Sequence, residues 1–540
     1  MFQCKPVRNQ PMKKLFPIAI AACIFAGCSS TKHYNAHLND LISAQDLKSD
    51  VDFIHKKLEQ LHPNLYWYIS KNELDFKFDS IKKTISNPMT SLSFHQKISP
   101  VISAVRQGHM YVHPPAKVFS KSQNDSIKKR GTGPLSQFQY ERIGDKIYVV
   151  KNKSNDKSIK IGSEVVAVNG ISPSELFGEY NHYFTSDGFN TTLKKNFSGT
   201  RFSTFYSYKL GVRDSVKFDF RFNDTLKTVV IKRTPDTTAI KKALGIKLTA
   251  LEKAKLKAER KALRKKQDTE GFDEVAKVYN RNLRFMEPDS SVAVMKINSF
   301  TKGYSADFYK ESFSKIKDCK SKTLIIDLRN NGGGRLREIK DLYSYLTDST
   351  AALIDDCEVV SKTSLLRSNY FKGGGVGMTV FKTLYAPFYY TGNFFKVHQT
   401  QNKKYAYSKD SKPVKIKPDA FKGKIYVLIN GGSFSASCIL SSNLKGSGRA
   451  YFVGEETGGT YNGTVAGIMP EVVLPNSKIR VRIGLVFIKP HYKTEKDGRG
   501  IFPDKEIIPT LQDRINGSDP EIEWILEDIK TNPVVVTIQN

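Results

Sequence analysis

Residues 324–334 read Leu-Ile-Ile-Asp-Leu-Arg-Asn-Asn-Gly-Gly-Gly, a mostly apolar run that ends in polar residues and three glycines. This pattern predicts a buried strand that leads into a glycine turn. Because glycine has no Cβ, the backbone N–H groups of such a turn are free to face a ligand. A turn of this kind is able to hold a developing oxyanion.

A second apolar strand is predicted further along the chain, at residues 425–429. It leads into Asn-Gly-Gly-Ser-Phe-Ser-Ala-Ser at residues 430–437, and a helix pattern comes directly after it. A serine at a strand-to-helix turn is exposed and lies near the positive end of the helix dipole. For Ser433 and Ser437 we expect the ordinary role of a helix N-cap.

These two strands belong to a longer alternation of strand and helix patterns, from Ser291 to about Leu526. Strand patterns cover residues 292–297, 324–328 and 425–429, and helix patterns cover residues 308–316, 339–346 and 436–444. Strands that alternate with helices are typical of an α/β domain, which we assign to residues 289–530.

Three motifs together resemble the tail-specific, or C-terminal processing, serine peptidases. They are Asp-Leu-Arg-Asn-Asn-Gly-Gly-Gly at 327–334, Gly-Ser-Phe-Ser-Ala-Ser at 432–437 and Gly-Glu-Glu-Thr-Gly-Gly at 454–459. The resemblance implies a ClpP/crotonase-like α/β catalytic domain with Ser435 as its nucleophile. It also implies that the N–H groups of Ala436 and of the Gly332 or Gly333 turn stabilise the tetrahedral oxyanion.

One position departs from the pattern of many members of this family. Members with a serine–lysine dyad carry the lysine soon after the third motif, where this chain has Thr460. The tricorn-type branch instead pairs its serine with a histidine from an N-terminal segment and an acid near the end of the domain. His109, in Gln-Gly-His-Met at 107–110, matches that histidine, although neither Asp nor Ser precedes it. A neutral imidazole is a competent base for a hydroxyl.

The acid of that branch has a candidate in Asp-Gly-Arg-Gly-Ile-Phe-Pro-Asp at 497–504. Asp497 stands where the branch has a glutamate, which implies that it orients His109, directly or through an intermediary. The alternative is an Asx-turn residue in a glycine-rich loop. His491 is a second candidate base that no motif supports.

The start of the chain predicts export. Lys13 and Lys14 precede an apolar run at 15–25 and then Ala-Gly-Cys at 26–28, which is typical of a signal peptide over residues 1–27. Small residues before a cysteine resemble the bacterial lipobox, so Cys28 is the predicted lipidation site. Residues 28–40 would form a lipidated tether, with folded structure beginning near Leu41. The expected location is the bacterial cell envelope, lipid-anchored and facing the periplasm.

Three further regions precede the α/β domain. Residues 41–115 show helical periodicity, and residues 236–288 read as a basic helical linker. Between them, residues 133–235 show short strand patterns, and Ile-Gly-Ser-Glu-Val-Val-Ala-Val-Asn-Gly at 161–170 resembles the core of a PDZ domain with an Asn-Gly hairpin turn. Such a domain binds an extended peptide as an added strand, and a plain β-sandwich is the alternative. The predicted fold class is multidomain α/β.

The composition excludes several other classes of protein. With 540 residues, 39% of them hydrophobic, the chain is long enough and apolar enough for several folded domains. The formal net charge is +32, but Lys and Arg are spread along the chain without a nucleic-acid-binding signature, so we expect no nucleic-acid partner. Cys319, Cys357 and Cys438 show neither a disulfide framework nor metal spacing, and a Cys319–Cys357 pair stays open. A mobile flap is expected at Gly-Gly-Gly-Val-Gly, residues 373–377.

The sequence therefore predicts a serine endopeptidase that acts on a peptide or protein through an acyl-enzyme at Ser435, without a metal or cofactor. The missing lysine and the changed residues around His109 leave a second hypothesis, a lipid-anchored peptide-binding scaffold that is catalytically inactive. A third is hydrolysis of another acyl compound by the same serine.

Overall fold

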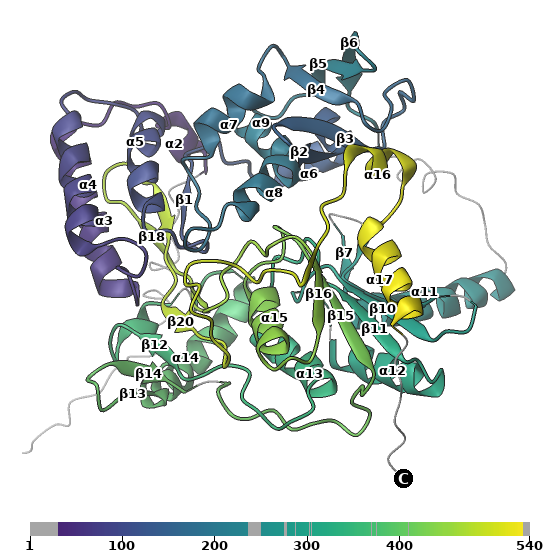
Figure 1. Ribbon diagram of the computed structural model, residues 1–540. Helices are drawn as coiled ribbons and strands as arrows, with labels where there is room; N and C mark the ends of the chain where they lie inside the picture. The colour runs from purple at the N-terminus through teal and green to yellow at the C-terminus, as the bar shows by residue number, and fades with distance from the viewer. Residues whose placement is uncertain are drawn as a thin grey trace, which may run out of the picture.

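The computed structural model describes residues 31–235 and 250–532, with gaps at 275–277, 287, 302, 304, 369, 374 and 409. The predicted signal peptide and Cys28 lie outside the described residues, as does the first part of the predicted linker. Within the described ranges, no helix has both the length and the hydropathy needed to cross a bilayer. Figure 1 shows N-terminal helices, a smaller sheet with its own helices, and a larger α/β region.

The N-terminal region is a small group of helices: α3 (Ala44–Leu61), α4 (Lys71–Thr84) and α5 (Ser91–Ser103). Each begins after a hydroxyl N-cap that accepts a hydrogen bond from the backbone, which satisfies one of the free N–H groups of the first turn. Their buried faces follow the apolar periodicity of the sequence, as in α3. A short helix, α2 (Thr31–Ala36), forms earlier than the expected start near Leu41.

The second region is an antiparallel sheet in the order β2-β3-β4-β5-β6, packed against α7, α8 and α9. Its strands and helices are β2 (Phe138–Ile143), β3 (Lys146–Asn152), β4 (Glu164–Val168), β5 (Ser215–Phe222), β6 (Thr225–Lys232), α7 (Pro173–Tyr180), α8 (Thr192–Thr200) and α9 (Phe202–Leu210). The Asn-Gly turn at 169–170 forms with positive φ at both residues. It closes a minimal hairpin, in which Val168 and Ile171 exchange both backbone hydrogen bonds, at 2.9 and 3.0 Å. The hairpin does not extend further, because the chain then leads into α7 and β4 pairs along its length with the distant β5.

The α/β region is built on a six-stranded sheet in the order β21-β16-β15-β11-β10-β9. All neighbours are parallel except β9, which pairs antiparallel with β10 at one edge. The strands are β9 (Arg281–Phe285), β10 (Val292–Ile297), β11 (Thr323–Asp327), β15 (Lys424–Ile429), β16 (Tyr451–Gly454) and β21 (Lys505–Glu506). The predicted strands of the α/β domain are confirmed to within about one residue, as expected for long apolar runs.

Both faces of this sheet are covered, which explains why β11 is apolar at nearly every position. Leu324 and Ile326 belong to the main core, together with residues of α12 (Ser305–Asp318), α13 (Leu336–Leu346) and α15 (Ala436–Gly446). Ile325 belongs to a second core that contains Ile522 and Ile525 of α17 (Pro520–Thr531). The alternation of strand side chains therefore distributes one strand between two cores.

Smaller elements complete the molecule. A five-stranded sheet has the order β13-β14-β12-β20-β17, a three-stranded sheet has the order β1-β19-β18, and β7 pairs with β8. The last two residues of the expected flap, 376 and 377, instead begin a long helix that extends to residue 396. These elements are β1 (Tyr111–His113), α6 (Lys121–Lys129), α11 (Ala250–Glu270), β7 (Phe272–Asp273), β8 (Val278–Tyr279), β12 (Cys357–Val359), α14 (Val376–Lys396), β13 (Val397–Gln399), β14 (Tyr405–Tyr407), β17 (Thr464–Ala466), β18 (Glu471–Val473), β19 (Arg480–Arg482), β20 (Val486–Ile488) and α16 (Leu511–Asn516).

Candidate active site

The candidate nucleophile turn and the glycine turn lie side by side because the strands that lead into them are neighbours. β11 and β15 run parallel, with Asp327 opposite Leu428. The carboxyl ends of parallel strands meet at one edge of a sheet, where the loops of α/β folds commonly form ligand sites. Both predicted motifs therefore begin at the same place in the fold.

Hydrogen bonds from backbone and hydroxyl groups join the two turns. The Phe434 N–H donates to Asn331 O at 3.0 Å, and the Ser437 hydroxyl donates to the same oxygen at 2.8 Å. The Ser433 hydroxyl donates to Leu328 O at 2.8 Å. The N-cap prediction for these two serines is wrong, because the residue at the N-cap of α15 is Ser435. Their hydroxyls instead hold the turns at a fixed separation.

Ser435 has a strained backbone, with φ 58° and ψ −117°. Non-glycine residues rarely adopt a positive φ, and holding one there costs ~1–3 kcal/mol. The same strain is found where a nucleophilic serine is presented on a sharp strand-to-helix turn. Phe434 and Ala436 on either side are buried, whereas Ser435 itself is partly exposed. The turn therefore presents one hydroxyl from an otherwise closed surface.

His109 reaches this hydroxyl from the N-terminal region. It lies just before β1, which pairs with β19 of the α/β region, with Tyr111 opposite Arg482. The Arg482 Nε also donates to His109 O at 2.9 Å. The His109 Nε2 lies 2.9 Å from the Ser435 Oγ, within hydrogen-bonding distance. The structure thus brings together two residues that are far apart in the sequence.

The surroundings of His109 favour its neutral form. Burial of the ring, and then the positive charge of Arg482, lower the pKa of His109 to about 3. Its ring also lies 4.8 Å from that of Phe434, measured between centroids. An imidazole in this state is unprotonated at neutral pH and is able to accept a proton from a hydroxyl.

The glycine turn contacts the nucleophile turn so closely that a side chain would not fit. A Cβ on Gly333 would lie 2.7 Å from the Ser435 Cβ and 2.8 Å from the Ala436 nitrogen, and Gly333 has a φ of 95°. However, the Gly333 N–H donates to Asn331 Oδ1 at 2.9 Å and is therefore engaged elsewhere. Of the predicted oxyanion donors, the Gly332 and Ala436 N–H groups remain.

Asp497 does not contact His109 in this structure. Its carboxylate accepts hydrogen bonds from Trp67 Nε1 at 2.6 Å and from Asn462 Nδ2 at 3.0 Å. Among the residues that the structure describes, no acceptor takes a hydrogen bond from the His109 Nδ1. The directly orienting role that was predicted for Asp497 is therefore not formed, and only a role through an intermediary is left. The second candidate base, His491, binds Asp355 at 3.2 Å.

The third motif holds the loop that carries Asp497. Glu456 is buried and accepts hydrogen bonds from Gly500 N at 2.7 Å and from Arg499 Nη2 at 2.5 Å. Thr460, which stands at the position of the family's lysine, is buried and donates from its hydroxyl to Gly463 O at 2.6 Å. This part of the chain is a rigid support and contributes no base.

Sequence reasoning missed Asp187, a carboxylate only 1% exposed next to the His109 segment. Its Oδ1 accepts a hydrogen bond from Gly108 N at 2.6 Å, and burial raises its pKa to about 7. The next two residues tie the neighbouring loops together: Gly188 N donates to Arg106 O at 2.9 Å, and Phe189 N donates to Gly498 O at 2.8 Å. No motif surrounds Asp187 in the sequence, so only the tertiary structure reveals it.

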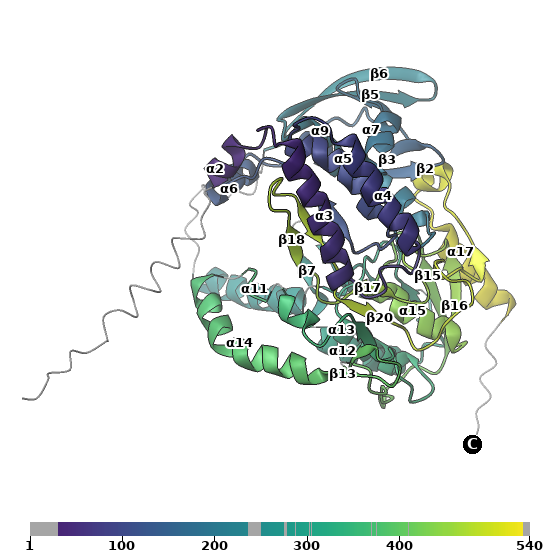
Figure 2. The same ribbon diagram turned by 90° about the vertical axis from the view of Figure 1, so that its left-hand side faces the viewer.

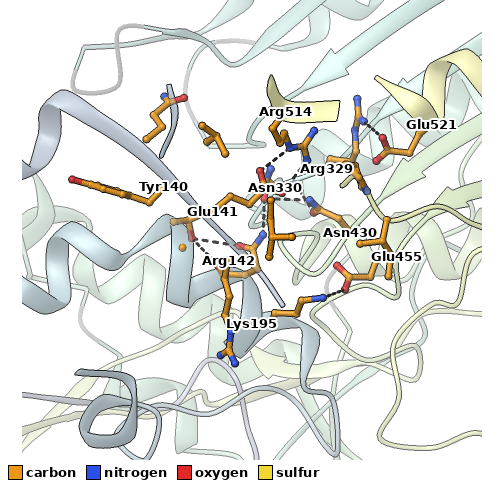
Figure 3. A pocket seen from close by; sticks show the side chains of 18 of the residues that line it. Tyr140, Glu141, Arg142, Lys195, Arg329, Asn330, Asn430, Glu455, Arg514 and Glu521 are labelled. Carbon is orange, nitrogen blue, oxygen red and sulfur yellow. Dashed lines mark hydrogen bonds and ion pairs between the residues drawn. The ribbon is translucent and has the colours of Figure 1, made fainter. Parts of the chain in front are cut away.

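A cavity of about 640 Å³ opens beside the two turns, between the smaller sheet and the α/β region. Figure 3 shows that Glu141 and Arg142 of β2 and Lys195 of α8 line it from one side, and Asn330 and Asn430 from the other. Asn330 follows the end of β11, and Asn430 directly follows the end of β15. The cavity therefore leads from the edge strand β2 toward the candidate nucleophile turn.

A group of potential metal ligands lies away from the candidate active site, on α3 and α4. In the described part of the chain, His55, Glu59 and Asp75 are the residues close enough together to share an ion. The Lys71 Nζ already lies 3.1 Å from Glu59 and 2.9 Å from Asp75. A bound cation at this point would have to displace that ammonium group.

Comparisons with known proteins bear on the family and the fold of the chain. The model of the family described as peptidase family S41 matches residues 291–507. No curated protein matches the sequence. The solved structure of mature CPAF is similar over 91% of this chain and 99% of its own, at 14% identity and a TM-score of 0.56. Mature CPAF complexed with lactacystin gives 15% identity, 90% and 98% coverage and a TM-score of 0.55. The photosystem II D1 C-terminal processing protease matches at 13% identity, 88% and 98% coverage and a TM-score of 0.40.

The structural likeness shows a shared fold across nearly the whole described chain, and the family match covers the region that contains both turns. Residues 291–507 therefore match peptidase family S41, and the chain is a serine-type peptidase.

Proposed function

We propose that the chain is an endopeptidase of the tail-specific processing type that cleaves peptides or proteins in the cell envelope through an acyl-enzyme at Ser435. The observation that carries the proposal is the 2.9 Å contact between the neutral His109 Nε2 and the Ser435 Oγ on its strained turn. A nucleophile and a base within hydrogen-bonding reach are what covalent catalysis by a hydroxyl requires.

In the proposed reaction, His109 Nε2 accepts the proton of Ser435 while Oγ forms a bond to the scissile carbonyl carbon. The carbonyl oxygen becomes an oxyanion, which the N–H groups of Gly332 and Ala436 would stabilise. The protonated His109 then gives its proton to the leaving amine as the C–N bond breaks. Water, deprotonated by His109, attacks the acyl-enzyme and restores Ser435.

Substrate entry is proposed along the cavity beside β2. This strand is at an edge of its sheet and comes after Gly133-Pro134-Leu135, an arrangement that suits the addition of an extended peptide as a further strand. Helix α8 packs directly on the strand, since a Cβ on Gly199 would lie 2.9 Å from Arg142 N. A peptide held here would extend toward the turns at Asn330 and Asn430. Anchoring in the envelope rests on the predicted lipidation of Cys28.

The test is labelling of the chain from Ser29 onward with a fluorophosphonate probe, which reacts with activated serines. We expect labelling of the wild type, and its loss in Ser435→Ala and in His109→Ala. Ser447→Ala, at an exposed serine at the other end of the same helix, and His491→Ala are matched controls that should label normally.

Each outcome separates the hypotheses. A folded wild type that does not label would favour the inactive peptide-binding scaffold. Labelling that survives Ser435→Ala would refute the choice of nucleophile. If the protein labels but cleaves small esters and no member of a peptide panel, the substrate is another acyl compound.

A further inference from the structure

Helix α14 is turned with its apolar side toward solvent. The side that packs on the protein contains small and polar groups: Ala386 is partly buried, and Asn393 is buried and accepts a hydrogen bond from the Tyr407 hydroxyl at 3.0 Å. Tyr389 stacks on Tyr370, with ring centroids 4.2 Å apart. An amphipathic helix of a globular domain ordinarily faces its large apolar residues inward.

The outward side of α14 carries seven large apolar residues, which we call the α14 apolar face. Leu384, Phe388 and Phe395 are 72%, 71% and 75% exposed. The face consists of Met378, Val380, Phe381, Leu384, Tyr385, Phe388 and Phe395. Scattered exposed apolar residues are ordinary, but a contiguous group on one helix marks a surface that is covered in use.

The chain around this face has an unusual charge pattern. Between Glu358 and Asp410 the sequence contains no Asp or Glu. The same segment contains eight basic residues: Lys362, Arg367, Lys372, Lys382, Lys396, Lys403, Lys404 and Lys409. Two of them pair with acids from outside the segment, Lys372 with Glu471 and Lys404 with Glu358, whereas Lys396 and Lys403 are exposed near the end of the helix.

We propose that the α14 apolar face docks on an anionic lipid surface, with the helix lying in the plane of the headgroups. Phenylalanine, leucine and methionine on one side of a helix, with lysines at its ends and no acids, are what such a surface binds. A second copy of this chain fits less well, because self-association would bring two acid-free basic segments together. The like charges would then oppose the contact.

The position of α14 agrees with this docking. Figures 1 and 2 show α14 on the outside of the α/β region, on the same side of the molecule as α2. Helix α2 begins three residues after Cys28, the predicted lipidation site. A lipid chain at that end and the α14 apolar face would be able to meet one membrane plane together, and neither would block the cavity beside β2.

The test measures co-sedimentation of the chain from Ser29 onward, which contains every described residue, with lipid vesicles. Vesicles of phosphatidylglycerol mixed with phosphatidylcholine are compared with vesicles of phosphatidylcholine alone. The variant Leu384→Gln/Phe388→Gln/Phe395→Gln removes the apolar side chains, and Leu41→Gln/Phe76→Gln, both 70% exposed, is the matched control. Peptidase activity on a soluble peptide checks that each variant is folded.

We expect the wild type and the control to bind the anionic vesicles, and the α14 variant to bind at least about tenfold more weakly. Binding should weaken at high salt, because the lysines contribute through screened charges. Equal binding of the wild type and the α14 variant would overturn the proposal. Absence of vesicle binding by the wild type would also overturn it. In that case, a dimer in sedimentation equilibrium that the α14 variant dissociates would assign the face to a second copy of this chain.

Discussion

At the scale of single residues, burial decides the charge of two groups beside the nucleophile, in opposite directions. It lowers the pKa of His109 and raises the pKa of Asp187, because in both cases it disfavours the charged form. The result is a neutral base next to a carboxyl group that binds a proton near neutral pH. Both effects have measurable consequences.

The first concerns the pH dependence of Ser435 acylation. A solvent-exposed histidine with a pKa of about 6.5 would lose roughly tenfold in the rate of fluorophosphonate labelling between about pH 7.5 and 5.5, since its protonated form is no base. With the pKa of His109 at about 3, we expect the rate to change less than about twofold over that range.

Arg482 supplies the matched variants for this measurement, because its charge is a cause of the low pKa of His109. Arg482→Gln removes the positive charge, so the acid limb of the rate profile should move toward higher pH. Arg482→Lys keeps the charge and should leave the limb nearer its original place. An acid limb close to pH ~6.5 in the wild type would contradict the environment described for His109.

The second consequence concerns stability. The pKa of Asp187 is raised to about 7 in the fold, from about 3.9 in an unfolded chain. Between these values the folded state binds a proton that the unfolded state has released, so the free energy of unfolding falls as pH rises through this window. Asp187→Asn resembles the protonated form and removes this loss. Urea unfolding should therefore show the variant on the order of 1–3 kcal/mol more stable than the wild type at about pH 8, and no more stable at about pH 4.

The lowered pKa of His109 also makes the free energy of unfolding depend on pH. His109 is present in both proteins, so this contribution cancels from the difference between them. Asp145→Asn, at a side chain that is 97% exposed, is the control and should change stability equally at both pH values. A difference between Asp187→Asn and the wild type that does not vary with pH would show that Asp187 is already ionised throughout the window.

At the scale of elements, the two turns act as one unit because each needs the other's backbone. Gly333→Ala places a methyl group against Ser435 and Ala436 at a positive φ, so the turns must separate. We expect the loss of probe labelling and a free energy of unfolding lower by about 2–4 kcal/mol.

Gly332→Ala is the matched control, since a Cβ there would meet nothing within 4 Å. Its N–H is kept, so it should fold and retain most of its labelling. If both substitutions abolish labelling with little change in stability, the close approach of Gly333 to Ser435 is not what holds the turns together. Thermal unfolding and labelling of the same samples distinguish these results.

The elements also show which parts of this fold a sequence can predict. The strands β11 and β15 were predicted from apolar runs that end in glycines, and the helix at Ala436 from the helical spacing of the apolar residues after the second run. Helix α14 was not predicted, because its large apolar residues face outward and its packed side is polar, the reverse of the usual pattern. Strands such as β12 and β20 are three residues long and pair across distant parts of the chain, so local pattern carries no signal for them.

At the scale of the whole molecule, the candidate site is assembled from segments that meet only in the folded chain. His109 comes from the N-terminal helical region, Asp187 from the smaller sheet region, and Ser435 from the α/β region. Motif resemblance pointed to His109 and Ser435, since each motif carries its own local signature. The contact between them, and the position of Asp497 against Trp67, depend on the pairing of β1 with β19, which no local pattern encodes.

One ion pair joins the smaller sheet to the C-terminal end of the α/β region across the cavity. Arg514 of α16 donates from Nε and Nη2 to the two carboxylate oxygens of Glu141 on β2, at 2.8 and 2.9 Å, as Figure 3 shows. A two-point contact of this kind fixes orientation as well as distance. Together with the Lys195–Glu455 ion pair, it helps to fix how β2 faces the candidate nucleophile turn.

Reversing the charge of Arg514 should separate the binding of a long peptide from the reactivity of Ser435. Arg514→Glu opposes Glu141, so we expect the value of KM for a long peptide to rise about threefold to tenfold, while the small fluorophosphonate probe labels Ser435 at the normal rate. The double variant Arg514→Glu/Glu141→Arg restores opposite charges and should recover at least part of the loss. A labelling rate that falls in step with peptide cleavage would instead place the damage in the α/β region, and no recovery in the double variant would mean that the pair does not govern the placement of β2.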